Sequence, residues 1–78
     1  MNRYVATFFS HFGALSYFKA LKGQGVASTL APVPRALSAS CGTCVRYEHG
    51  SAIDLDGCEL DHVYAESGGT LVSVLTKE

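Results

Sequence analysis

The sequence has no excess of either charge and no long apolar run, and these two absences exclude several classes of protein. Six Lys and Arg residues stand against seven Asp and Glu, giving a formal net charge of −1. Without a basic patch or polybasic tail, the chain is a poor candidate for binding nucleic acid or a membrane surface. The apolar run after Arg3 breaks at Ser10 and His11, too soon for a signal peptide or a membrane span. We therefore expect a cytoplasmic protein.

Cysteine is also scarce, and the three residues present form an odd set: Cys41, Cys44 and Cys58. Secreted disulfide frameworks use even numbers at denser spacing. A structural zinc site needs four ligands, and His49, Cys58 and His62 would join the Cys41–Cys44 pair only in a favourable fold or across two copies. We expect thiols in a reducing compartment, with no metal site and no cofactor.

The chain is nevertheless apolar enough to fold, because 47% of its 78 residues are hydrophobic. Its length allows one domain over residues 1–78, at the small end for a self-sufficient core. A homodimer is one way for so small a domain to gain stability.

The first third of the chain predicts a strand, a helix and a second strand. Residues Tyr4–Phe9 are β-branched or aromatic over the length of a strand. Ser10 is a suitable N-cap for a helix whose apolar residues fall at helical spacing over Phe12–Leu21. Glycines at 23 and 25 end that helix, and Val26–Ala31 is a strand that Pro32 stops or confines to an edge.

The second half predicts a strand over Cys44–Glu48, with Val45 and Tyr47 on one face and Cys44 and Arg46 on the other. A further strand covers Thr70–Thr76.

Between these strands two structures compete. Asp56 and Glu59 have the spacing of a capping box, and Leu60, Val63 and Tyr64 share a helical face. The alternative is an extended segment with Asp56-Gly57 as a hairpin turn. We favour the helix, which makes the order strand, helix, strand, strand, helix, strand. That order predicts an α+β ferredoxin-like βαββαβ sandwich, a four-stranded antiparallel sheet with two helices on one face.

The segment from Pro32 to Tyr47 carries the chemistry. It places Cys41 and Cys44 three positions apart after a loop of small and polar residues, with Arg35 and Arg46 on either side. Positive charge and exposed backbone N–H groups stabilise a thiolate, the reactive form of cysteine. Ser40 and Gly42 flank Cys41, and Gly42 lets successive N–H groups point at one anion.

This segment resembles the selenium/sulfur carrier-like family, a group of small bacterial domains. The resemblance rests on Phe8-Phe9-Ser10, Ala14 and Leu21, and on Pro32-Val33-Pro34-Arg35, Ser38, Ser40-Cys41-Gly42 and Val45-Arg46; it covers residues 3 to about 48. It implies a ferredoxin-like fold and identifies Cys41 as the carrier thiol. Cys44 and residues 49–69 depart from the family pattern.

These observations predict a carrier of reduced sulfur or selenium, held on Cys41 as a persulfide or selenosulfide, rather than a turnover enzyme. Its partners would be a desulfurase-type donor and an acceptor enzyme. One alternative is a dithiol redox module using Cys41 and Cys44, although no helix follows the pair as in redox Cys-x-x-Cys motifs. Another is a non-catalytic interaction module. His11 could help to deprotonate Cys41 if the first and third strands are neighbours, or it is a surface residue.

Overall fold

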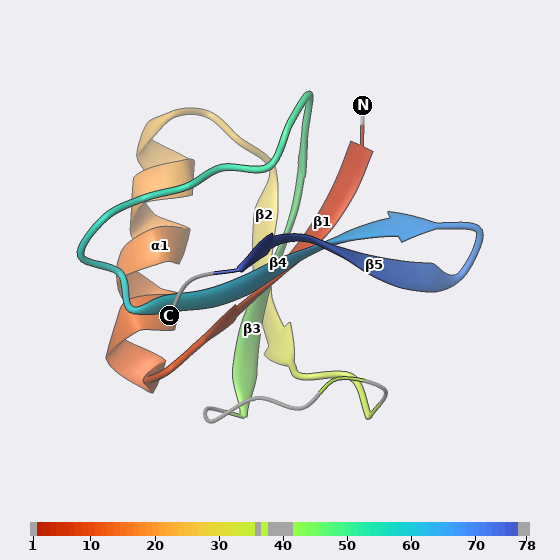
Figure 1. Ribbon diagram of the computed structural model, residues 1–78. Helices are drawn as coiled ribbons and strands as arrows, with labels where there is room; N and C mark the ends of the chain where they lie inside the picture. The colour runs from red at the N-terminus through yellow and green to blue at the C-terminus, as the bar shows by residue number, and fades with distance from the viewer. Residues whose placement is uncertain (1, 36, 38–41, 77–78) are drawn as a thin grey trace.

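The structure, a computed structural model, describes residues 2–35, 37 and 42–76, in which one helix packs on a five-stranded antiparallel sheet (Figure 1). Along the chain the elements are β1 (Asn2–Phe8), α1 (His11–Gly23), β2 (Ser28–Pro32), β3 (Thr43–His49), β4 (Leu60–Ser67) and β5 (Thr70–Thr76). The strands lie in the order β2-β3-β1-β4-β5, so β1 is central and β2 and β5 are the edges.

The predicted four-stranded βαββαβ ferredoxin-like sandwich is therefore wrong, since the described residues contain one helix and five strands. The expected second helix is replaced by a turn at Asp56-Gly57 followed by β4. Leu60 and Val63 are buried, as a helix would also require, but β4 instead pairs along its length with β1. The alternative of an extended segment over residues 53–64 is right for residues 60–64, which belong to β4. Its hairpin is not formed, because the residues just before the Asp56-Gly57 turn are not in a strand.

The other elements follow the sequence closely. Strands β1, β2 and β3 lie within two residues of their predicted bounds, and β5 has the bounds predicted for it. Pro32 ends β2 at the edge of the sheet, where the absence of its N–H costs no hydrogen bond between strands. The predicted N-cap is confirmed: the Gly13 N–H donates to Ser10 Oγ over 3.1 Å. Gly25 follows the helix with φ +75°, a value that favours glycine.

The core lies between α1 and one face of the sheet. Tyr4, Ala6 and Phe8 of β1 point to this face and meet Tyr17 and Leu21 of the helix. The Tyr17 ring lies 5.1 Å from that of Phe8, edge to face. The buried side of α1 thus centres on Tyr17, whereas Leu15 and Phe18 are half-buried.

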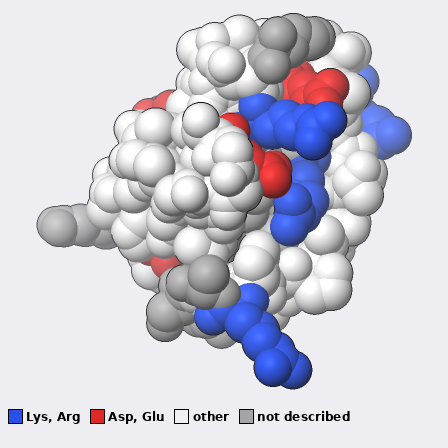
Figure 2. Space-filling model, turned by 90° about the vertical axis from the view of Figure 1, so that its right-hand side faces the viewer, with Lys and Arg blue, Asp and Glu red and all other residues white. Residues whose placement is uncertain are grey.

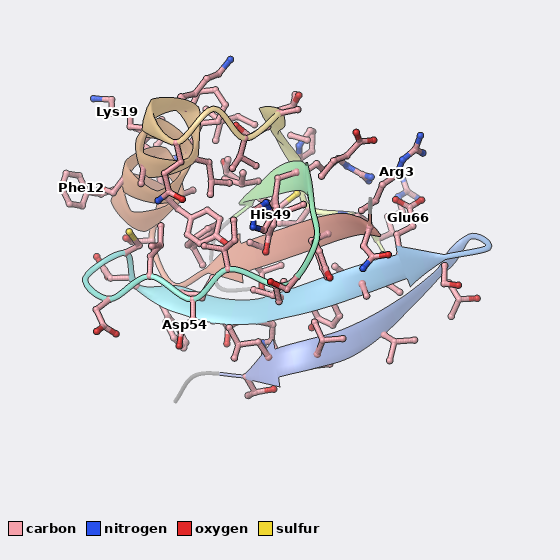
Figure 3. All side chains as sticks on the ribbon, turned by 90° about the horizontal axis from the view of Figure 1, so that it is seen from above. Arg3, Phe12, Lys19, His49, Asp54 and Glu66 are labelled. Atoms are coloured by element: carbon pink, nitrogen blue, oxygen red, sulfur yellow. The ribbon has the colours of Figure 1, made fainter. Side chains whose placement is uncertain are left out.

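Residues 50–59 take the place that a second helix would occupy, and they run beside α1 (Figures 1 and 3). The Tyr17 hydroxyl donates to the Ile53 carbonyl over 2.7 Å, and the Ile53 N–H donates to the Tyr47 hydroxyl over 3.0 Å. Burial raises the pKa of both tyrosines, so these hydroxyls stay protonated at neutral pH. The irregular segment is therefore fixed by hydrogen bonds to two core tyrosines.

Glu59, expected to cap its own helix, instead supports the start of α1. Its carboxylate accepts a hydrogen bond from Ser10 Oγ at 2.9 Å, and its carbonyl accepts from the Phe9 N–H at 2.9 Å. One turn further on, Gly13 touches the backbone carbonyl of Cys58, where any side chain would collide. The close packing of the segment before β4 against α1 thus requires a glycine at position 13.

Gly13→Ala should destabilise the protein by about 1–3 kcal/mol, because the new methyl group must displace the Cys58 carbonyl. In an open helical position the same exchange stabilises by roughly 0.5–1 kcal/mol. Gly23→Ala is the matched control, since an added Cβ there meets no atom. Urea unfolding midpoints measure both. A Gly13→Ala midpoint at or above that of Gly23→Ala would contradict the close contact.

Candidate functional site

The predicted thiol segment leaves and re-enters the sheet at one point. Pro32, the last residue of β2, pairs with Thr43, the first residue of β3. One step beyond, the Val33 N–H donates to the Gly42 carbonyl over 3.1 Å. A turn follows, closed by the Leu37 N–H on the Pro34 carbonyl at 3.0 Å. This pair of strand ends, with Val33 and Gly42, is called the loop base below.

The predicted site residues divide into three groups. Ser40 and Cys41 lie outside the described residues. Gly42 and Arg35 are exposed, the first at the loop base and the second in the turn after Pro34. Cys44 and Arg46 belong to β3, where Cys44 is buried and Arg46 is exposed. The structure thus brings Gly42 and Cys44 together at the start of β3 and places Arg46 two residues further along.

The N-terminus of α1 lies beside the loop base. Strands β1 and β3 are antiparallel neighbours, with Thr7 opposite Cys44, so the end of β1 and the start of α1 meet the start of β3. His11 Nδ1 lies 3.1 Å from Thr43 Oγ1. This is the strand pairing on which the predicted closeness of His11 to the loop depended. A helix N-terminus carries partial positive charge, which favours an anion nearby.

Cys44 and Cys58 are hidden from solvent. Cys44 has no exposed surface, and its Sγ donates to the Pro32 carbonyl at 3.5 Å. It points to the sheet face opposite α1, as the alternation predicted. Cys58 packs in the core against α1, and burial raises the pKa of its thiol. A raised pKa lowers the thiolate fraction of Cys58 at neutral pH, and Cys44 has no surface open to a reactant, so both thiols are poorly placed to react.

Arg46 extends over β1 on the face opposite α1, and its Nη1 lies 3.9 Å from Glu66 Oε1 of β4. Among residues 2–35, 37 and 42–76, no cluster of three His, Cys, Asp or Glu side chains has the arrangement to hold a metal ion. In the same part of the chain no helix is long and apolar enough to span a membrane.

Residues 3–56 match the family described as "Putative Se/S carrier protein-like". The chain belongs to this family. The match covers well over half of the sequence and confirms the resemblance drawn from the proline-arginine-to-cysteine segment. No curated protein and no solved structure matches the chain. In this carrier-like protein the matched part contains β1, α1, β2, β3 and the segment up to Asp56, whereas β4 and β5 lie beyond it.

Sequence reasoning missed two contacts of this region. Thr43 binds His11 although 32 positions separate them, and Glu66 reaches Arg46 from a strand that the sequence assigned in part to a helix. Neither contact has a local signal, because both depend on β1 lying between β3 and β4.

Alkylation should separate the hidden thiols from Cys41. In Cys41→Ser, iodoacetamide should modify the native protein about tenfold or more slowly than the urea-unfolded protein, because Cys44 and Cys58 are buried. Mass spectrometry of quenched samples measures both rates. Equal rates in the two states would show that one of these thiols is open to solvent.

Proposed function

We propose that this protein carries reduced sulfur or selenium on Cys41 as a persulfide or selenosulfide, between a desulfurase-type donor and an acceptor enzyme in the cytoplasm. The observation that carries the proposal is the family match over residues 3–56, which includes the whole cysteine segment. The loop base adds physical support. Gly42 and Thr43 lie beside the N-terminus of α1, where partial positive charge and the imidazole of His11 favour a neighbouring thiolate.

The proposed transfer is a thiol exchange that needs no external oxidant. The Cys41 thiolate attacks the outer sulfur of a donor persulfide, forms the new S–S bond and releases the donor thiolate. The carried atom keeps its oxidation state, and its proton stays with it or passes to the donor thiolate. In the second step an acceptor thiolate attacks the same outer atom and regenerates the Cys41 thiolate.

The dithiol alternative needs Cys44 to attack a sulfur on Cys41. The Cys44 thiol is fully buried and donates to the Pro32 carbonyl, so it has to leave the sheet face before it can react. The structure therefore favours a carrier with one working thiol, and a resolving role for Cys44 stays a prediction.

A persulfide transfer assay tests the carrier function. Incubation with a cysteine desulfurase and cysteine should add the mass of one sulfur atom to the intact protein, and a thiol reductant should remove it. Cys41→Ser should gain no mass, whereas Cys44→Ala should gain it as the wild type does. A disulfide between Cys41 and Cys44, formed in place of the sulfur adduct, would replace the carrier function with the redox alternative.

His11→Gln should slow alkylation of Cys41 at pH 7 by about twofold to fivefold, since it removes an imidazole from the loop base and leaves the helix intact. His49→Gln is the matched control, because His49 ends β3 at the opposite end of the strand. Because Cys44 and Cys58 are buried, the measured alkylation rate is that of Cys41. Equal rates in both variants would remove His11 from the account of thiol activation.

A further inference from the structure

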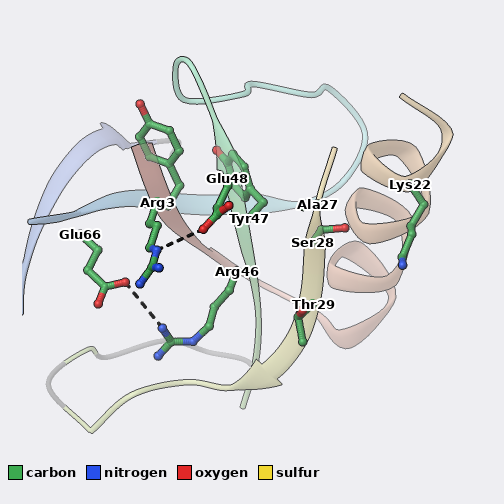
Figure 4. Close-up of a pocket in the computed structure, with 10 residues that line it drawn as sticks. Arg3, Lys22, Ala27, Ser28, Thr29, Arg46, Tyr47, Glu48 and Glu66 are labelled. Atoms are coloured by element: carbon green, nitrogen blue, oxygen red, sulfur yellow. Dashed lines mark hydrogen bonds and ion pairs between the residues drawn. The ribbon is translucent and has the colours of Figure 1, made fainter. Parts of the chain in front are cut away.

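A groove of about 500 Å³ lies beside strands β1, β2 and β3 and the end of α1 (Figure 4). Its charged lining consists of Arg3, Lys22, Arg46, Glu48 and Glu66, and Thr29 of β2 contributes a hydroxyl. Figure 2 shows Lys and Arg side chains gathered over one face of the molecule, with carboxylates between them. None of these residues takes part in the sulfur-transfer steps proposed above.

The groove is positive in a chain whose formal net charge is −1. Three cationic side chains line it against two carboxylates, which leaves one net positive charge. A local excess of positive charge attracts an anionic partner and orients its approach.

The two arginines already bind carboxylates of the protein itself, as the dashed lines in Figure 4 show. Arg3 Nε lies 3.1 Å from Glu48 Oε2, and Arg46 Nη1 lies 3.9 Å from Glu66 Oε1. The Arg3 side chain is 70% exposed and that of Arg46 is 46% exposed. Exposed pairs of this kind contribute about 0–1 kcal/mol, so an incoming carboxylate can displace them at little cost. The long Arg46 contact also leaves most of its five N–H donors for a ligand.

The shape of the site favours an extended peptide over a compact anion. β2 is an edge strand of the described sheet, so its outer backbone N–H and C=O groups are placed to pair with an added strand. Thr29 of β2 stands directly opposite Arg46 of β3. Every second side chain of a strand added to β2 would therefore lie on the same face of the sheet as Thr29 and Arg46. Arg46 extends over β1 to Glu66, so its guanidinium must leave that carboxylate to meet the added segment.

We propose that this groove and the β2 edge bind an acidic, extended segment of a partner protein, with a carboxylate of the segment on Arg46. β2 ends at the loop base, so the bound segment would lead its protein toward the cysteine loop. The binding goes beyond the carrier function, because the groove needs no sulfur on Cys41 to hold such a segment.

Fluorescence anisotropy with a fluorescein-labelled peptide of alternating Glu and Val, blocked at both ends and as long as β2, tests the proposal at low salt. Binding should saturate and should weaken about tenfold in Arg46→Gln, which loses charge-assisted hydrogen bonds. Lys19→Gln is the matched control for charge: Lys19 is exposed on α1 and does not line the groove, so this variant should bind as the wild type does (Figure 3).

Glu66→Gln provides the sharper test, because it removes the carboxylate that competes for Arg46. The peptide should bind about twofold to fivefold more tightly to this variant. Arg46→Lys keeps the positive charge but loses the planar guanidinium that can bind a carboxylate with two hydrogen bonds. Its affinity for the peptide should lie between those of the wild type and Arg46→Gln. Unchanged urea midpoints in these surface variants would confirm that each is folded. Cys41→Ser should bind the peptide normally, which separates this result from that of the sulfur assay.

Three outcomes would overturn the proposal. The first is the absence of saturable binding by the folded wild type. The second is equal weakening in Arg46→Gln and Lys19→Gln, which would mean that only net charge matters. The third is tighter, Arg46-dependent binding of a single-stranded oligonucleotide, which would assign the groove to nucleic acid instead of an acidic protein segment.

Discussion

The pairing of β1 with two partners distant in sequence is the constraint on which the rest of the structure depends. Tyr4 to Phe8 are all buried. β1 has a strand on each edge, and its side chains are covered on both faces of the sheet. Pairing with β3 brings the start of α1 to the loop base, and pairing with β4 brings Glu66 within reach of Arg46. Both the candidate thiol site and the charged groove are therefore consequences of the position of one strand.

The sequence predicts those elements whose signals are local. Ser10 caps the helix, Pro32 stops a strand, and the alternation at Val45 and Tyr47 identifies the core face of β3. The prediction of a second helix is wrong because the spacing of apolar residues is ambiguous over so short a stretch. Leu60 and Val63 suit one face of a helix, yet they are buried in a strand, and only pairing with β1 decides between the two. Glu59, the expected capping residue, supports α1 instead of a helix of its own.

The candidate site divides in the same way. Cys41 and its flanking motif can be found in the sequence, and the family match spans the segment that contains them. The contact between His11 and Thr43 and the groove on the opposite face cannot be found there, because each unites strands that are far apart in the chain. Cys44 shows the limit of spacing alone: three positions from Cys41, it belongs to a strand interior and is closed to solvent.

The β4–β5 hairpin contrasts with the centre of the sheet in its folding kinetics. Gly68 and Gly69 have φ of +56° and +83°, the left-handed values that a tight two-residue hairpin turn requires. Ser67 pairs with Thr70, whereas Tyr4 must find Tyr47 and Ala65. Closing a short loop loses far less chain entropy than closing one of 40 residues or more. We therefore expect the β4–β5 hairpin to form early from local contacts, and formation of the central strand to set the folding rate.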